Sequence, residues 1–141
     1  MANPRDDLVA VAMEHAAAEG DDDPARVFAT LEDDPVYELQ PVGLAFRGMD
    51  ATRAYYDHFF STFRPTVDSY ELRGEWVNDV GVAQEYTIWT RPAGGGAVQR
   101  DDVFAILTFG SSLLSGERLY GRKRLLRAMF GPAYDLARPI T

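Results

Sequence analysis

The spacing of apolar positions divides this chain into two parts. Up to Pro65, apolar residues recur at three- and four-residue intervals, which predicts helices over residues 6–20 and 24–31 and a third helix that ends at Arg64-Pro65. Two short strands, residues 36–40 and 44–47, are expected between the second and third helices. Pro41, Val42 and Gly43 form the turn that separates these strands.

The third helix carries a stripe of aromatic side chains. Tyr55, Tyr56, Phe59, Phe60 and Phe63 recur at helical spacing and therefore share one broad face. So much aromatic surface on one short helix requires a large, curved partner. We expect this helix to lie on a bent sheet, with a pocket between them.

After Pro65 the apolar and polar positions alternate, which is typical of strands. The pattern predicts four strands, then a terminal helix closed by Gly131-Pro132, and a loosely structured tail over about residues 132–141. The expected strands are residues 66–77, 82–91, 99–109 and 113–120, and the helix is residues 123–130. Helices first, then a strand meander, predict a single α+β domain over residues 1–141 with a mostly antiparallel sheet.

One of these strands is apolar at nearly every position. Residues 103–109 read Val-Phe-Ala-Ile-Leu-Thr-Phe, whereas a strand with one solvated face would alternate. The helices can cover only one side of the sheet. A second copy of the chain is the simplest cover for the other side, so we expect a homodimer through the sheet.

Composition restricts the class of function. Of 141 residues, 46% are hydrophobic and 26% are charged, which is typical of a globular protein, and no apolar run is long enough to span a membrane. The chain has no cysteine, so we expect a cytoplasmic location. With only two histidines and no nucleotide motif, we expect no metal and no cofactor.

The net charge of −8 disfavours nucleic acid as a partner. A cluster of five basic residues near the C-terminus is the local exception. It is interpreted either as a solvated helix face or as an anion-binding patch. Its members are Arg118, Arg122, Lys123, Arg124 and Arg127.

Three stretches resemble the SnoaL-like branch of the nuclear transport factor 2-like superfamily. They are residues 16–38, with Gly20-Asp21 and Asp33-Asp34; Arg47-Gly48 with the aromatic stripe; and residues 116–131, which begin Gly-Glu-Arg-Leu-Tyr. The resemblance implies a cone-shaped α+β barrel, usually dimeric, with N-terminal helices on a curved sheet. It also implies a deep apolar pocket between the helices and the concave face of the sheet.

The catalytic acids of the best-known relatives are not matched. By this resemblance Gln40 stands where ketosteroid isomerases place their base, and Met13 and Ala105 stand near their two oxygen-binding positions. The Asp-Arg-Asp set of limonene-type epoxide hydrolases finds no counterpart on the corresponding strands. Gly121-Arg122 follows Tyr120 where polyketide cyclases carry an acid.

Three other residues are candidate proton carriers. His15 is either a hydrogen-bonded core histidine or a general base. Glu117, like Glu85, is either paired with an arginine or raised in pKa and usable as an acid. Asp102 is either a strand-edge charge in water or a proton carrier.

Aromatic and amide side chains are expected to bind the ligand, with Tyr37 or Tyr86 holding an oxygen. The full set is Tyr37, Gln40, Tyr55, Trp76, Tyr86, Trp89 and Phe104. Two hypotheses remain. The first is a cofactor-free cyclase, dehydratase or isomerase-like enzyme that transfers protons on an apolar small molecule. The second is a non-catalytic ligand-binding or interaction module with the same pocket.

Overall fold

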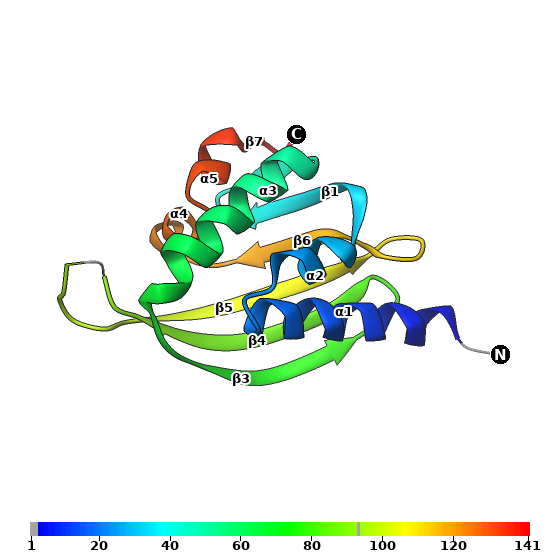
Figure 1. Cartoon of the computed structure of the whole chain (residues 1–141), viewed down its shortest axis with the longest axis horizontal. Coiled ribbons are helices and arrows are strands. Elements are labelled where there is room, and N and C mark those ends of the chain that lie inside the picture. The colour runs from blue at the N-terminus through cyan, green and yellow to red at the C-terminus, as the bar shows by residue number, and fades with distance from the viewer. Residues whose placement is uncertain (1–2, 93) are drawn as a thin grey trace.

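A computed structural model describes residues 3–92 and 94–141 and places helices over one face of a seven-stranded sheet (Figure 1). The strand order is β3-β4-β5-β6-β1-β2-β7. The strands are β1 (Leu31–Gln40), β2 (Leu44–Arg47), β3 (Val67–Val77), β4 (Gly81–Thr90), β5 (Gln99–Phe109), β6 (Leu114–Tyr120) and β7 (Arg138–Pro139). All neighbouring pairs are antiparallel except β1 and β6, which are parallel. The predicted α+β class is confirmed.

Of the five α-helices of the described residues, the two N-terminal ones begin at capping side chains, whereas the other three have no side-chain cap. The five helices are α1 (Pro4–Gly20), α2 (Pro24–Ala29), α3 (Met49–His58), α4 (Lys123–Phe130) and α5 (Pro132–Leu136). Asn3 caps α1 by accepting a hydrogen bond from the Arg5 amide, and Asp23 caps α2 through the Arg26 amide. A π-helical turn (Phe59–Phe63) and a 3-10 turn (Arg64–Thr66) continue α3 into β3.

The aromatic stripe packs into the core as predicted. Tyr55 and Tyr56 are buried, and the Tyr55 ring stacks on Phe130 of α4 with centroids 4.3 Å apart. Tyr37 of β1 stacks on Phe46 of β2 at 5.1 Å. The helix α3 is thereby fixed to both the sheet and the C-terminal helices.

Most element boundaries lie within about two residues of the sequence prediction, and two features differ by more. β1 begins at Leu31 rather than at residue 36, because the buried Leu31 pairs with Leu114 of β6 before the register shifts towards Val36. The tail is also ordered over much of its length. Ala133 and Tyr134 of α5 are buried, and β7 pairs with β2, so these contacts anchor the tail. The apolar face of α5 is too short to be recognised from the spacing of apolar residues in the sequence.

The largely apolar part of β5, residues 103–109, is covered on one side only within a single chain. Val103, Ala105 and Leu107 are buried under the helices, whereas Phe104 on the opposite, convex face is 37% exposed. Trp76 of β3 is 55% exposed, and its ring lies 6.3 Å from that of Phe104. An apolar patch therefore remains on the convex face, as the expected dimer requires.

Internal contacts engage most of the basic cluster. Arg124 pairs with both oxygens of the buried Asp101 at 2.9 Å, and Arg122 lies 3.7 Å from the same carboxylate. Arg118 pairs with Glu38, and the Arg127 guanidinium covers the Tyr134 ring. These contacts favour a structural role for the cluster.

Within the described residues, no helix is long and apolar enough to cross a membrane.

Candidate functional site

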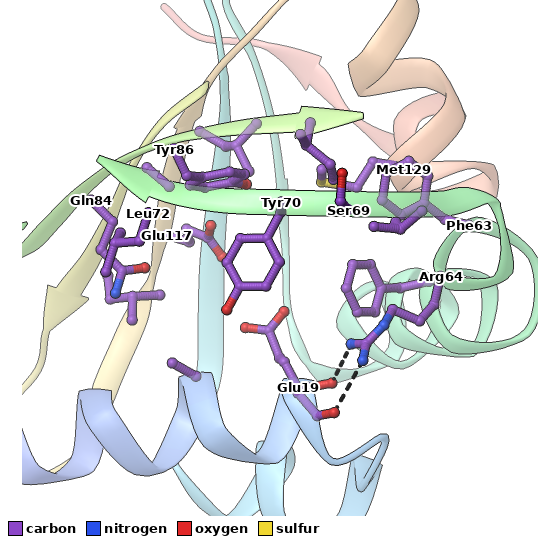
Figure 2. Close-up of a pocket in the computed structure, with 18 of the residues that line it drawn as sticks. Glu19, Phe63, Arg64, Ser69, Tyr70, Leu72, Gln84, Tyr86, Glu117 and Met129 are labelled. Atoms are coloured by element: carbon purple, nitrogen blue, oxygen red, sulfur yellow. Dashed lines mark hydrogen bonds between the residues drawn. The ribbon is translucent and has the colours of Figure 1, made fainter. Parts of the chain in front are cut away.

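A cavity of about 410 Å³ lies between α1, the turn after α3 and the concave face of β3 to β6 (Figure 2). This size is within the range of small-molecule sites. Most of its wall is apolar, including Phe59, Phe63, Val67, Ile88, Leu107 and Met129. The curved sheet supplies one wall and the helices the other.

Glu117 projects into this cavity from β6. Alternation along the strand directs Glu117 and Leu119 to the concave face, while Arg118 and Tyr120 point to the convex face. Glu117 is only 8% exposed. Among the described residues, none donates a hydrogen bond or offers a cation to its carboxyl group. The arginine pairing considered from the sequence is therefore not found there.

The surroundings of Glu117 favour its protonated form. Burial raises the pKa of Glu117 well above its ordinary value, and the nearby negative charge of Glu19 raises this pKa further. The carboxyl group thus keeps its proton over a pH range in which an exposed glutamate has lost it. Burial likewise raises the pKa of the neighbouring Tyr86 hydroxyl, so Tyr86 stays neutral and able to donate a hydrogen bond.

Glu19 faces the same cavity from the last turn of α1. Figure 2 shows the Glu19 and Glu117 side chains directed into the cavity from opposite walls. Arg64 fixes the end of α1 by donating to the backbone carbonyls of Glu19 (2.7 Å) and Gly20 (3.0 Å). The position of the Glu19 side chain therefore depends on a contact between the turn after α3 and the end of α1.

His15 lies one turn before Glu19 and does not line the cavity. It is fully buried, and its Nε2 lies 3.0 Å from Glu19 Oε1. Its Nδ1 lies 2.8 Å from Thr30 Oγ1, and its Nε2 is also 3.1 Å from the Tyr56 hydroxyl. His15 is thus a hydrogen-bonded core histidine that contacts a cavity carboxylate from behind.

Asp102 lies away from the cavity. Strand alternation puts Val103 and Ala105 on the concave face and Asp102 on the convex face, where its side chain is 60% exposed. The hydroxyl of Thr87 donates to it at 2.7 Å and lowers its pKa, and Arg100 lies 3.1 Å away. A ligand in the cavity does not meet this residue. Glu85 is likewise exposed on the convex face.

Two of the seven expected ligand-binding residues, Tyr55 and Tyr86, line the cavity. Tyr37 fills the core, and its hydroxyl lies 3.0 Å from that of Tyr56. The side chains of the other four point to the convex face because successive residues of a strand point to opposite faces. The pattern of apolar residues in the sequence does not show which of the two faces lines the cavity. These four residues are Gln40, Trp76, Trp89 and Phe104.

Glu19, Arg64 and Tyr70 also line the cavity, although they were not among the site residues expected from the sequence. Glu19 had a signal, because it follows His15 by four residues on the inward side of the first helix. Tyr70 is 68% exposed on the edge strand β3, with its ring 6.4 Å from that of Tyr86. No local pattern distinguishes such a residue from an ordinary surface tyrosine.

Solved structures share the fold of this chain, although no family model and no curated protein matches the sequence. A proposed SnoaL-like polyketide cyclase from Jannaschia sp. CCS1 superposes with a TM-score of 0.71 at 11% identity, over 94% of this chain and 97% of that one. A nuclear transport factor 2-like protein from Burkholderia xenovorans LB400 gives 0.65 at 16% identity, over 90% and 98%. The chain has the nuclear transport factor 2-like fold.

The nuclear transport factor 2-like fold of this chain is also shared by Bal32a from a soil-derived mobile gene cassette. That structure gives a TM-score of 0.70 at 11% identity and covers 91% of this chain and 98% of its own. Identities of this size show a common fold and nothing about activity. The chemistry of this nuclear transport factor 2-like domain has to be argued from its own cavity.

Proposed function

We propose that the cavity binds a small, largely apolar molecule and that Glu117 and Glu19 transfer protons on it without a cofactor. The observation that carries this proposal is the buried Glu117 carboxyl group, which faces Glu19 across an apolar cavity and has no partner among the described residues. Its oxygens open onto the cavity, since no fully buried side-chain oxygen or nitrogen of the described residues lacks a hydrogen-bond partner. A carboxyl group in such a poorly solvated place costs stability, and such costs concentrate at functional sites.

The two carboxyl groups have different environments and hence different proposed roles. Glu117, held protonated, donates to a carbonyl or leaving oxygen of the substrate, and the Tyr86 hydroxyl supports that oxygen. Glu19 takes a proton from a carbon of the substrate, and the electron pair left behind moves towards the oxygen. This division of roles suits an isomerisation, a dehydration or an aldol closure.

The charged lining residues also favour a ligand without an anionic group. Glu19 and Asp68 are acidic, Glu117 is held protonated and offers no positive charge, and the one basic lining residue within the described chain, Arg64, is engaged by backbone carbonyls. A carboxylate or phosphate placed among them would meet repulsion in a poorly solvated site. We therefore propose a neutral substrate.

A non-catalytic binding module is the second candidate. One observation favours it: of the three proton carriers expected from the sequence, His15, Asp102 and Glu117, only Glu117 lines the cavity. Both candidate functions require a ligand in the cavity, and they differ in whether the protein converts it. Incubated with the protein, the ligand stays chemically unchanged if the protein is a binding module and is converted to a product if the protein is an enzyme.

Native mass spectrometry of the purified protein tests the shared claim. We expect a bound mass of a small organic molecule that is retained in Glu85→Gln, on the convex face, and lost in Ala105→Phe. Ala105 is buried in the cavity wall, so the larger ring fills the ligand space. An Ala105→Phe variant that folds like wild type and keeps the adduct would place the ligand elsewhere.

The convex apolar patch supports a homodimer, which we propose as the assembly. Phe104→Asp puts a charge in the centre of the patch formed with Trp76 and Tyr120. We expect wild type to sediment at about twice the 15.7 kDa chain mass and Phe104→Asp to sediment as a monomer. A wild-type monomer at micromolar concentration would contradict the dimer.

A further inference from the structure

A chain of buried polar side chains lies directly behind the Glu19 wall of the cavity. Its members are Thr30 at the end of α2, His15 of α1, Tyr56 of α3 and Tyr37 of β1, and each is at most 4% exposed. Successive polar atoms lie 2.8, 3.1 and 3.0 Å apart. A buried polar network destabilises the fold unless each donor and acceptor has a partner. This requirement allows the atom that carries each proton to be assigned.

Thr30 determines which ring nitrogen of His15 carries a proton. The Thr30 hydroxyl donates to the Val27 carbonyl at 2.6 Å, so its single proton is already used. The 2.8 Å contact between Thr30 Oγ1 and His15 Nδ1 therefore needs a proton on Nδ1. His15 is fixed as a donor on the side away from the cavity.

The opposite nitrogen then contacts the cavity carboxylate. His15 Nε2 lies 3.0 Å from Glu19 Oε1, and at that distance two lone pairs would repel each other. One proton must lie between these two atoms. If it resides on Nε2, the ring is an imidazolium bonded to a carboxylate, and Glu19 Oε2 remains free to accept.

The groups around His15 favour this placement of the proton. Glu19 faces the ring from α1, Thr30 from the end of α2 and Tyr56 from α3, with Tyr37 of β1 behind Tyr56. Glu117 of β6 lies near Glu19 on the far wall, and Asp68 of β3 also lines the cavity. The nearby cation Arg64 donates to the backbone carbonyls of Glu19 and Gly20 and, within the described residues, forms no ion pair with the Glu19 carboxylate.

We propose that His15 is a positioning residue that holds Glu19 ionised, oriented and ready to accept a proton, an inference that rests on the proposed function. The substrate's carbon-bound proton goes to Glu19 Oε2, its electron pair stays on the substrate, and the proton on Nε2 remains in place. Glu117 supplies the other proton. His15 thereby assigns the two carboxyl groups their different roles, with Glu19 as the base and Glu117 as the acid.

The ring nitrogens of His15 can be observed directly, since the chain contains only His15 and His58. In protein labelled with ¹⁵N-histidine, we expect both His15 nitrogens to show one-bond N–H couplings at neutral pH. In Glu19→Gln the carboxylate is gone, and we expect the coupling at Nε2 to be lost while that at Nδ1 persists. Glu14→Gln, an exposed change on the same helix, is the matched control and should leave both couplings in place.

A merely structural histidine would give a different result. A wild-type ring with a proton on Nδ1 alone, or a spectrum unchanged by Glu19→Gln, would overturn the positioning role. This outcome is separable from failure of the proposed function. If His15 is doubly protonated but the protein binds no small molecule, the Glu19–His15 ion pair is supported and the proposed enzymatic function is contradicted.

Discussion

Replacing Glu117 by glutamine is expected to lower turnover of the ligand recovered from the cavity by about 10²- to 10⁴-fold, the usual contribution of a positioned proton donor. The amide has nearly the same shape as the protonated carboxyl group and fits the same buried place on β6. It can donate a hydrogen bond but cannot transfer the proton. Ligand binding, followed by native mass spectrometry, should therefore survive in this variant.

Two controls separate lost chemistry from lost folding. Glu85→Gln makes the same change on the exposed convex face and should leave turnover unchanged. Glu117→Gln should also be at least as stable as wild type at neutral pH. The unfolded state of wild type gains stability by releasing the Glu117 proton above the ordinary glutamate pKa, whereas the folded state keeps this proton because its pKa is raised. Normal turnover in Glu117→Gln would eliminate Glu117 as the acid.

The second large effect is expected at Gly116, the residue that precedes Glu117. Gly116 adopts φ +144°, and a Cβ there would overlap the carbonyl oxygen of Val36 on the parallel neighbour β1. Gly116→Ala therefore has to separate β6 from β1 or strain the backbone. We expect a loss of roughly 3 kcal/mol or more in unfolding free energy, which corresponds to a fall in Tm of about 10 °C.

Gly20→Ala is the matched control for this change. A Cβ at Gly20, the last residue of α1, meets no atom within 4 Å, so a methyl group should be tolerated. Thermal unfolding followed by circular dichroism compares the two variants. A Gly116→Ala protein as stable as Gly20→Ala would show that the close approach of β6 to β1 does not fix the position of Glu117.

The fold was predictable because many residues contribute to each of its signals. The aromatic stripe on α3, the change of period after Pro65 and the alternating strands each rest on several positions, so single errors do not matter. The short segment after Gly131 had too few apolar residues for such averaging. Only the structure shows that Ala133 and Tyr134 are buried there.

The candidate site was less predictable, because it depends on which way single side chains point. Glu117 was identified from its apolar strand, but the same argument selected Glu85, which strand alternation places on the exposed convex face. The Glu19–His15 contact joins two residues of one helix, yet its meaning depends on Thr30 and Tyr56 from other elements. Local sequence carries no information about such an arrangement.

Titration of the Glu117 carboxyl carbon by ¹³C NMR tests the central claim most directly. The resonance is assigned by its absence in Glu117→Gln and compared between folded and urea-unfolded protein. We expect the folded protein to lose the Glu117 proton at a clearly higher pH than the unfolded chain, and Glu19→Gln to reduce the difference because it removes a nearby negative charge. A Glu117 that titrates at the same pH in both states would contradict a protonated acid in the cavity.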